Sequence, residues 1–459
     1  MIYPNKSAFT SEEIDELCAQ YKKHNSIDVE TSEQYGVKRG LRNSDGTGVL
    51  AGLTNICDVV GYEKDDDGNV LPIDGKLYYR GFDVEDIINS GKQDQRFLFE
   101  EVMWLLLFGD LPSSEQLTKF SKLIDTHREL PEGFSELMIF SAPSKSIMNK
   151  LQRSVLAMYG YDENPDDTSL NNVMRQSIAL ICELPAMMIY AYQAKVHTYD
   201  HGSLFFHYPQ AGLSTAEHIL AISRSQQDYT KEEAHLLDTC LVLHMDHGGG
   251  NNSTFTSRVL SSTGTDTYSA ISAAIGSLKG PKHGGANHKV LQQLNDILEN
   301  VDDVYDDEKM KDYLRKLINK EAGDKSGLIY GMGHAVYTLS DPRAQLLKKE
   351  LEPIAEETGY AKEYHVLNAI ERLAPDLLKE QKQNSKNVCA NIDLYSGLVY
   401  QILGISEDLY TPLFAVARIP GWCAHRIEEL EFANRIMRPA YKCIYDKREY
   451  VALDDRKKK

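Results

Sequence analysis

The stretch Gly280-Pro-Lys-His283-Gly-Gly-Ala-Asn287 sets a histidine among glycines and a proline. Two similar stretches follow it, Gly331-Met-Gly-His334-Ala-Val336 and Asn391-Ile-Asp393-Leu-Tyr-Ser-Gly397. Glycine lets a backbone crowd a ligand and holds polar side chains out of the core. One such histidine alone would suggest a hydrogen-bonded turn residue, but three stretches in order favour chemistry. We therefore interpret His283, His334 and Asp393 as candidate catalytic residues.

Three arginines accompany these stretches: Arg343 in Ser-Asp-Pro-Arg, Arg418 in Phe-Ala-Val-Ala-Arg and Arg438 in Ile-Met-Arg-Pro. The last two sit in largely apolar local sequence. A buried guanidinium needs an anionic partner. Several arginines converging on one site would suit a substrate with more than one carboxylate, each held by a two-pronged hydrogen bond.

A further histidine pair, His244-Met-Asp-His247, ends an apolar run. The i, i+3 spacing would place both rings on one face of a helix that ends at Gly248-Gly-Gly250. A metal site there would need a third ligand, so a metal-dependent hydrolase is only a distant alternative. We expect His244 to be a hydrogen-bonded core residue, and His247, nearer the glycines, to be the one available for function.

Length, charge and cysteine usage limit the possible functions. A chain of 459 residues exceeds the usual size of one hydrophobic core, so we expect two domains. A net charge of −18 argues against nucleic-acid binding. The seven cysteines show no C-x-x-C spacing, which is typical of reduced thiols. The N-terminus does not read as a signal or transit peptide, and no apolar run looks long enough to cross a bilayer, so we expect a cytoplasmic protein without a membrane partner.

The dominant hydrophobic period is helical. The capping box Thr10-Ser-Glu-Glu13 predicts a helix start, Phe97 to Phe108 predicts a helix stopped by Gly109, and Pro185 predicts a kink in the apolar segment 178–192. β-Branched residues around the turn Asp65-Asp-Asp-Gly68 predict a hairpin with strands near 54–60 and 70–79. The sequence therefore predicts a mainly α-helical fold with one small β hairpin.

Taken together, these motifs resemble those of the citrate synthase family. To the stretches above the resemblance adds Leu77-Tyr-Tyr-Arg-Gly-Phe-Asp-Val-Glu-Asp-Ile87 and Phe99-Glu-Glu-Val, and it extends in order from about Leu41 to about Arg438. Each motif alone is weak, whereas the ordered set is specific.

The resemblance implies a homodimer in which residues 1–283 and 401–459 form a large helical domain. Residues 284–400 would form a small domain that closes over the active-site cleft. The implied reaction condenses acetyl-CoA with oxaloacetate and water to give citrate and CoA. No metal or organic cofactor is implied, because acetyl-CoA is a substrate.

The resemblance also implies residue roles. Asp393 would take a proton from the acetyl methyl group while neutral His283 donates a hydrogen bond to the thioester oxygen. His334 would protonate the ketone oxygen of oxaloacetate. His247, Arg343, Arg418 and Arg438 would hold its carboxylates, with Arg438 coming from the neighbouring subunit. A loop would line the CoA site, formed by Leu328, Ile329, Tyr330, Gly331, Met332 and Gly333.

The chain departs from the usual family pattern in three places. Gly248 stands where an acidic residue is common, which leaves the orientation of His247 open. Tyr337-Thr-Leu-Ser340 stands where basic residues often precede Asp-Pro-Arg, and His288-Lys289 replaces a common Gln-Glu pair. The grip on the CoA phosphates is therefore open, and Lys282, Lys289 and Lys348 are candidate substitutes.

Two other functions stay open at this stage. A 2-methylcitrate synthase would use propionyl-CoA on the same fold, and one methylene changes affinity in an apolar pocket by only ~1–3 kcal/mol. A helical paralogue that binds a ligand without turnover is the alternative of another class. The intact His283, His334 and Asp393 argue against it. The sequence predicts no role for the segment before about Gly40.

Overall fold

A computed structural model describes residues 10–43, 45–382, 387–433 and 435–456. Its contacts divide the chain into two units, Met1–Leu53 and Thr54–Lys459. The described part of the first unit contains helices α1 (Ser11–His24), α2 (Val29–Gln34) and the short 3-10 turn η1 (Arg39–Leu41). Helix α1 begins at the predicted capping box, in which the Thr10 side chain accepts from the Glu13 backbone and Glu13 reaches back. That predicted helix start is confirmed.

The second unit opens with a small antiparallel sheet. Strand β1 (Cys57–Lys64) pairs with β2 (Val70–Tyr79), and β3 (Phe82–Asp83) adds two residues to the far edge of β2. The carboxylate of Asp65 holds the turn by accepting from the Asn69 backbone at 2.7 Å. The register shifts between Val60 and Tyr62, which marks a bulge. The predicted hairpin is confirmed.

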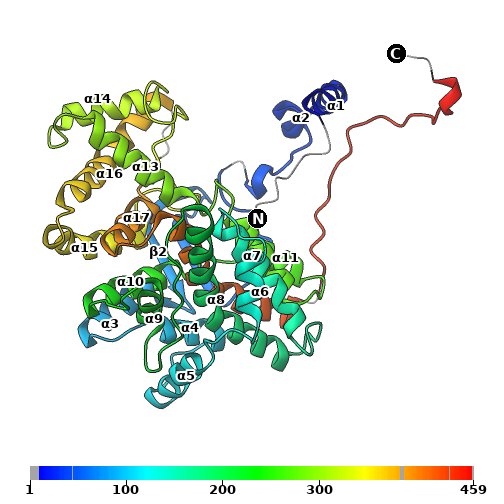
Figure 1. Cartoon of the computed structure of the whole chain (residues 1–459). Helices are drawn as coiled ribbons and strands as arrows, with labels where there is room; N and C mark the ends of the chain where they lie inside the picture. Colours follow the sequence, from blue (N-terminus) through cyan, green and yellow to red (C-terminus); the bar gives the residue numbers. More distant parts are fainter. Residues whose placement is uncertain (1–9, 44, 383–386, 434, 457–459) are drawn as a thin grey trace. The chain divides into compact units, whose positions relative to one another are not determined.

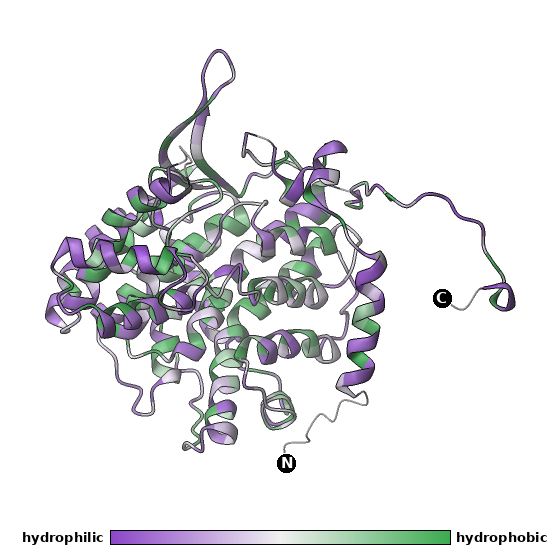
Figure 2. Cartoon of the chain, turned by 90° about the horizontal axis from the view of Figure 1, so that it is seen from above, coloured by the Kyte–Doolittle hydropathy of each residue, from purple (hydrophilic) through white to green (hydrophobic). Residues whose placement is uncertain are grey.

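The rest of the second unit is mainly helical, as predicted (Figure 1). Its longer helices are α3 (Val84–Asp94), α4 (Phe99–Phe108), α5 (Ser114–Thr126), α6 (Phe134–Phe140), α7 (Ile147–Ala157), α8 (Leu170–Tyr199), α9 (Thr215–Ser223), α10 (Lys231–His244), α11 (Asn252–Ser261), α12 (Thr267–Leu278), α13 (Ala286–Asn300), α14 (Asp307–Ile318), α15 (Pro342–Glu357), α16 (Ala361–Lys382), α17 (Asp393–Ile402) and α18 (Tyr410–Glu428). Hydrophobic and hydrophilic residues are interspersed along many of them (Figure 2), as expected when one face of a helix is buried.

Helix α8 corrects one expectation from the sequence. Its 30 residues are long and apolar enough to cross a bilayer by length and composition, although no such run was expected. However, 83% of its most apolar window is buried inside the protein, as in the core helix of a globular domain. Pro185 lies inside α8 without ending it, and the predicted kink stays a prediction.

Two groups of helices position the site. Helix α18 contacts α4, α8, α10, α11 and α12 and forms part of the core of the first group. Helices α13 to α17 pack against one another in a second group, coloured from yellow-green to orange in Figure 1. Contacts of α13 with α18 and of α15 and α17 with α10 join the groups. The domain division at residues 284–400 stays a prediction.

Candidate active site

The predicted site residues come from separate elements of the second unit. His283 lies in the turn before α13, His334 in the loop between α14 and α15, and Asp393 at the first position of α17. Arg343 lies in the first turn of α15, and Arg418 lies in the middle of α18. The folded chain brings all five together with His247, as the contacts and electrostatic interactions below show.

Three aromatic rings form the centre of the site. The ring centroids of His247 and His334 are 4.9 Å apart, with planes inclined at 77°. Tyr337 stacks on His334 at 4.7 Å and 23°, and presents its ring to His247 at 5.6 Å. Tyr337 is 1% exposed. The rings of the two histidines are therefore packed against each other and against Tyr337.

The tautomer of His334 follows from its backbone neighbours. Its Nδ1 accepts from the Val336 backbone N–H at 3.1 Å and from the Tyr337 backbone N–H at 3.0 Å. A neutral imidazole that accepts at Nδ1 carries its proton on Nε2. His334 is therefore set to donate a hydrogen bond from Nε2.

His283 is held by a serine that the sequence did not point to. The His283 Nε2 lies 3.1 Å from the Ser253 hydroxyl, which also accepts from the Trp422 indole N–H at 3.1 Å and donates to Asn251 Oδ1 at 2.9 Å. Burial, with the charge of Arg418, lowers the pKa of His283 to about 4. His283 is thus neutral at physiological pH.

Asp393 is a carboxylate with an unusual environment. Burial raises its pKa to about 6, although Arg343 opposes the shift. Its Oδ1 is buried and has no hydrogen-bond partner. Asn391 joins the loops that carry His334 and Asp393, because its amide donates to the Gly333 carbonyl at 2.9 Å while its oxygen accepts from the Asp393 backbone at 3.0 Å. Asp393 is therefore a buried carboxyl group of raised pKa, held in register with the His334 loop.

The two arginines differ in how they are satisfied. Arg418 is fully buried, and its Nε donates to the His244 carbonyl at 2.5 Å. Both of its terminal nitrogens are buried without a partner. Arg343 is already paired, through Nε and Nη2, with both oxygens of the buried Asp341 at 3.0 and 2.7 Å. Arg418 is therefore the cation most in need of an external anion.

The histidine pair is arranged differently from the prediction. Helix α10 ends at His244, so the two rings do not share a helix face, and the expectation that the helix ends at Gly248 was wrong. The chain turns here because Gly248 has φ +80° and its N–H donates to Asp246 Oδ1 at 2.7 Å. As expected, His244 is buried and bonds to the Cys240 carbonyl at 2.8 Å. Burial, helped by Arg343, lowers the pKa of His247 well below its usual value.

A buried ionic network fixes the turn that carries His247. His425 bonds to Asp246 through Nε2 at 3.2 Å and accepts from Arg258 at its Nδ1. Arg258 also bonds to Glu428 and, at 2.8 Å, to Glu429. Burial alone would raise the pKa of Asp246, but His425 and Arg418 hold it at about 2. The orientation of His247, which the sequence left open at Gly248, is thus set by Asp246 together with His425, Arg258 and Arg418.

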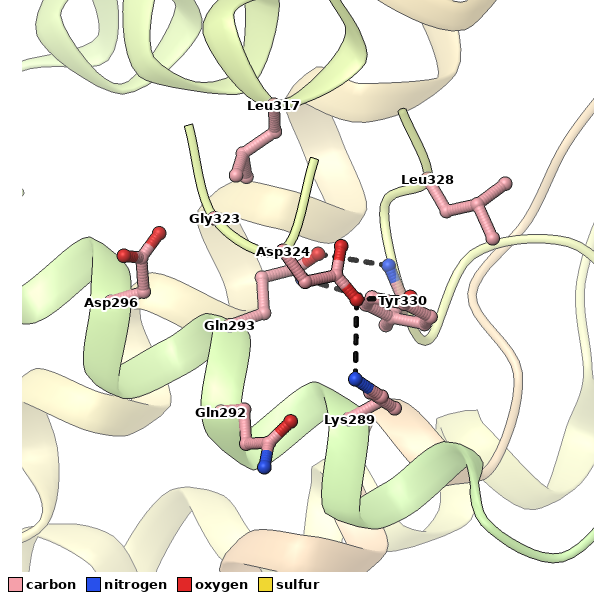
Figure 3. Close-up of a pocket in the computed structure, with 9 residues that line it drawn as sticks. All are labelled: Lys289, Gln292, Gln293, Asp296, Leu317, Gly323, Asp324, Leu328 and Tyr330. Atoms are coloured by element: carbon pink, nitrogen blue, oxygen red, sulfur yellow. Dashed lines mark hydrogen bonds and ion pairs between the residues drawn. The ribbon is translucent and has the colours of Figure 1, made fainter. Parts of the chain in front are cut away.

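The predicted CoA loop pairs with the segment before Asp393. The Gly333 backbone donates to Cys389, and the Asn391 backbone donates to Gly331. Behind this loop lies a pocket of about 200 Å³, lined by Lys289, Gln292, Gln293, Asp296, Leu317, Gly323, Asp324, Leu328 and Tyr330 (Figure 3). In it Asp324 accepts from Lys289 at 3.2 Å and from the Tyr330 hydroxyl at 2.6 Å.

The remaining candidates lie outside the cluster or already have partners. Arg438 is exposed in the single chain. Lys348 pairs with Glu371 at 2.6 Å, and Lys282 is exposed. Sequence reasoning missed the site contacts of Ser253, Asp341 and Tyr337. Asp341 and Tyr337 lie within stretches quoted from the sequence, and that was their only signal. Ser253 had no such signal.

Comparisons with known proteins show the family of the chain. The chain matches the family model described as "Citrate synthase, C-terminal domain" over residues 43–440. It is 34% identical over 389 residues to a citrate synthase of Haloferax volcanii, covering 83% of this chain and 93% of that protein. It is 30% identical over 427 residues to 2-methylcitrate synthase 1 of Corynebacterium glutamicum, covering 92% and 98%.

Solved structures give the same result. A ternary complex of carboxymethyl coenzyme A and oxaloacetate with the citrate synthase of Thermoplasma acidophilum superposes with a TM-score of 0.74 at 26% identity, over 92% of this chain and 99% of that one. The citrate synthase of Thermotoga maritima superposes with a TM-score of 0.71, also at 26% identity, over 92% and 100%.

Proposed function

This chain belongs to the citrate synthase family, and from that premise we propose that Asp393, His283 and His334 carry out its condensation of acetyl-CoA with oxaloacetate. The reaction forms a carbon–carbon bond and then releases CoA by hydrolysis, so the enzyme is of the acyltransferase type. The observation that carries the residue roles is the juxtaposition of a buried carboxylate of raised pKa with two neutral-type imidazoles and an unpaired arginine.

The first step is enolisation of the thioester. Asp393 takes a proton from the acetyl methyl group while His283 donates a hydrogen bond to the thioester oxygen, where negative charge develops. A pKa of about 6 keeps Asp393 ionised at pH 7 yet more basic than an ordinary aspartate. A pKa of about 4 keeps His283 neutral, so it donates a hydrogen bond without being a cation.

The second step joins the enol carbon to the ketone carbon of oxaloacetate. His334 Nε2–H hydrogen-bonds the ketone oxygen and supplies its proton as the new bond forms, giving citryl-CoA. Water then cleaves the thioester, which releases citrate and the CoA thiol. The unpaired terminal nitrogens of Arg418, with Arg343 and His247, would hold the carboxylates. These roles call for no metal or organic cofactor.

The assembly and location follow the family resemblance. We propose a cytoplasmic homodimer in which Arg438 reaches the neighbouring subunit's site, which agrees with its exposure in the single chain. All seven cysteines lie among the described residues and are unpaired, as expected of reduced thiols. Binding of oxaloacetate between the two helix groups would close residues 284–400 over the cleft and complete the acyl-CoA site.

The acyl group is the second question, because a 2-methylcitrate synthase is among the relatives. Release of CoA thiol, followed with a thiol-reactive dye, would be measured with acetyl-CoA and propionyl-CoA, with and without oxaloacetate. We expect oxaloacetate-dependent release, with a higher kcat/KM for acetyl-CoA. A higher value for propionyl-CoA would assign the 2-methylcitrate reaction, and no release with either would contradict the proposal.

The same assay tests the assigned base. Asp393→Asn keeps the shape of the side chain but removes its basicity. We expect it to lower kcat by ~10³-fold or more while the affinity for oxaloacetate, measured by calorimetry, changes little. Full activity in this variant would contradict the role of Asp393.

A further inference from the structure

The β1–β2 hairpin contacts the loop that carries His334 through two glycines. A Cβ atom on Gly61 would lie 2.7 Å from the Val336 carbonyl oxygen, and one on Gly75 would lie 2.2 Å from that of Ser340. Both distances are shorter than any ordinary contact, so these positions admit glycine alone without movement of the backbone. Gly61 lies at the bulge where the hairpin register shifts.

Hydrogen bonds tie the same two segments together. The Ser340 hydroxyl accepts from the Gly75 backbone at 3.1 Å and donates to Asp74 Oδ1 at 2.8 Å. The Tyr337 hydroxyl donates to the Lys76 carbonyl at 3.2 Å. These bonds join residues more than 260 positions apart in sequence. Ser340 and Tyr337 both lie in the segment where this chain departs from the basic residues common in the family.

The segment Val336–Ser340 holds His334 at one end and leads to Arg343 at the other. At one end, the Val336 and Tyr337 backbones donate to His334 Nδ1, and the Tyr337 ring stacks on the imidazole. At the other end, Ser340 leads into Asp341, which holds Arg343. A shift of the segment would therefore move the His334 ring and weaken the bonds that set its tautomer.

We propose that the β1–β2 hairpin is a positioning element of the active site, which holds the segment Val336–Ser340 and thereby the donor geometry of His334. The inference rests on the proposed role of His334. The hairpin touches no reacting atom, and acts through Gly61, Gly75 and the bonds of Ser340 and Tyr337. Since a misplacement of ~1 Å can cost ~10²-fold in rate, a loosened hairpin would slow the step that uses His334.

The test separates that step from enolisation, which uses Asp393 and His283. Condensation is followed by thiol release. Enolisation is followed by exchange of the acetyl-CoA methyl protons with D₂O, in the presence of malate, a dicarboxylate without the ketone. For Ser340→Ala and Tyr337→Phe we expect kcat for thiol release to fall roughly tenfold, with methyl exchange within about twofold of the wild type.

Gly61→Ala and Gly75→Ala are the stronger variants, and Gly160→Ala is the matched control. A Cβ on Gly160 meets no atom within 4 Å, and its backbone is not left-handed. We expect the control to behave as wild type in both assays. An equal loss of condensation and exchange in all hairpin variants would indicate general destabilisation and overturn the proposal. Unchanged condensation would overturn it as well.

A readout without turnover keeps the inference separate from the proposed function. Backbone amide exchange with deuterium, measured by mass spectrometry on peptides covering residues 336–340, reports the bonds to His334 directly. We expect faster exchange in Ser340→Ala and Gly61→Ala than in the wild type and Gly160→Ala. If the wild type released no thiol, the proposed function would fail, but amide exchange would still test whether the hairpin holds the segment Val336–Ser340. Unchanged amide exchange in the variants would overturn the positioning role of the hairpin.

Discussion

At the residue scale, the base of the proposed reaction costs the protein stability. Asp393 has a folded-state pKa of about 6 against a usual value of 3.8, because burial disfavours its charge. The folded state therefore binds more protons than the unfolded state between these values. By linkage, this side chain's contribution is most favourable below pH 3.8 and is lost as the pH rises through about 6.

Replacement by asparagine should reverse that loss. We expect the free energy of unfolding of Asp393→Asn, measured with urea, to exceed that of the wild type by about 1–3 kcal/mol at pH 7.5 and to match it near pH 4. Equal stabilities of the two proteins at pH 7.5 would contradict a raised pKa.

The raised pKa of Asp393 also predicts how the wild-type rate depends on pH. The wild-type kcat should fall about tenfold per pH unit below pH 6, as the base becomes protonated.

The glycine-flanked motifs located His283, His334 and Asp393 without a structure, because their chemistry shows in local sequence. Ser253 and Trp422 could not be found in this way. Ser253 contacts His283, 30 positions away, and Trp422, 169 positions away, so only folding brings them together. The sequence reveals the candidate reacting group, whereas the neighbours that hold it come from the packing of α11 and α18.

At the element scale, the sequence located helices well and misplaced one end that mattered. A capping box predicted the start of α1, and a glycine stop predicted the end of α4. The end of α10 was missed, because the bond from Gly248 to Asp246 competes with a further helical turn and depends on charges brought by α18. Tertiary partners, not local propensity, decide that end.

Helix α8 carries another buried acid, remote from the assigned roles. Glu183 is 8% exposed, its Oε2 has no partner, and burial raises its pKa to about 8 from 4.5. Its stabilising contribution is therefore present below pH 4.5 and lost as the pH rises through 8. We expect Glu183→Gln to stabilise the protein by about 1–3 kcal/mol at pH 8.5 and by little at pH 4.5.

Denaturant unfolding at the two pH values checks this expectation. Glu136→Gln, at an exposed position in the first turn of α6, is the control. It should cost no more than ~0.3–1 kcal/mol at pH 8.5, because it removes a favourable charge from the helix N-terminus. A destabilised Glu183→Gln at pH 8.5 would mean that the carboxylate has a charged or hydrogen-bonding partner in the assembled protein.

At the scale of the whole molecule, the proposed dimer makes a prediction about mixtures. Arg438→Ala and Asp393→Asn should each be nearly inactive alone. In a hybrid dimer, one site receives intact Asp393 from one subunit and intact Arg438 from the other. Random exchange of equal amounts should therefore restore about a quarter of the wild-type thiol release, since half the dimers are hybrids with one good site each. No recovery after demonstrated subunit exchange would place Arg438 in its own subunit's site, or outside any site.

A dicarboxylate held by Arg418, as proposed, would add to what keeps the polypeptide folded. The two terminal nitrogens of Arg418 are buried without a hydrogen-bond partner, although the Asp246 carboxylate interacts with the guanidinium electrostatically. A four-carbon dicarboxylate would supply the missing acceptors only in the native state, and would stabilise that state by RT ln(1 + [L]/Kd). The rate at which proteases degrade the protein in a cell would then depend on the concentration of dicarboxylates. The enzyme would persist while dicarboxylates are plentiful and become easier to degrade when they run out.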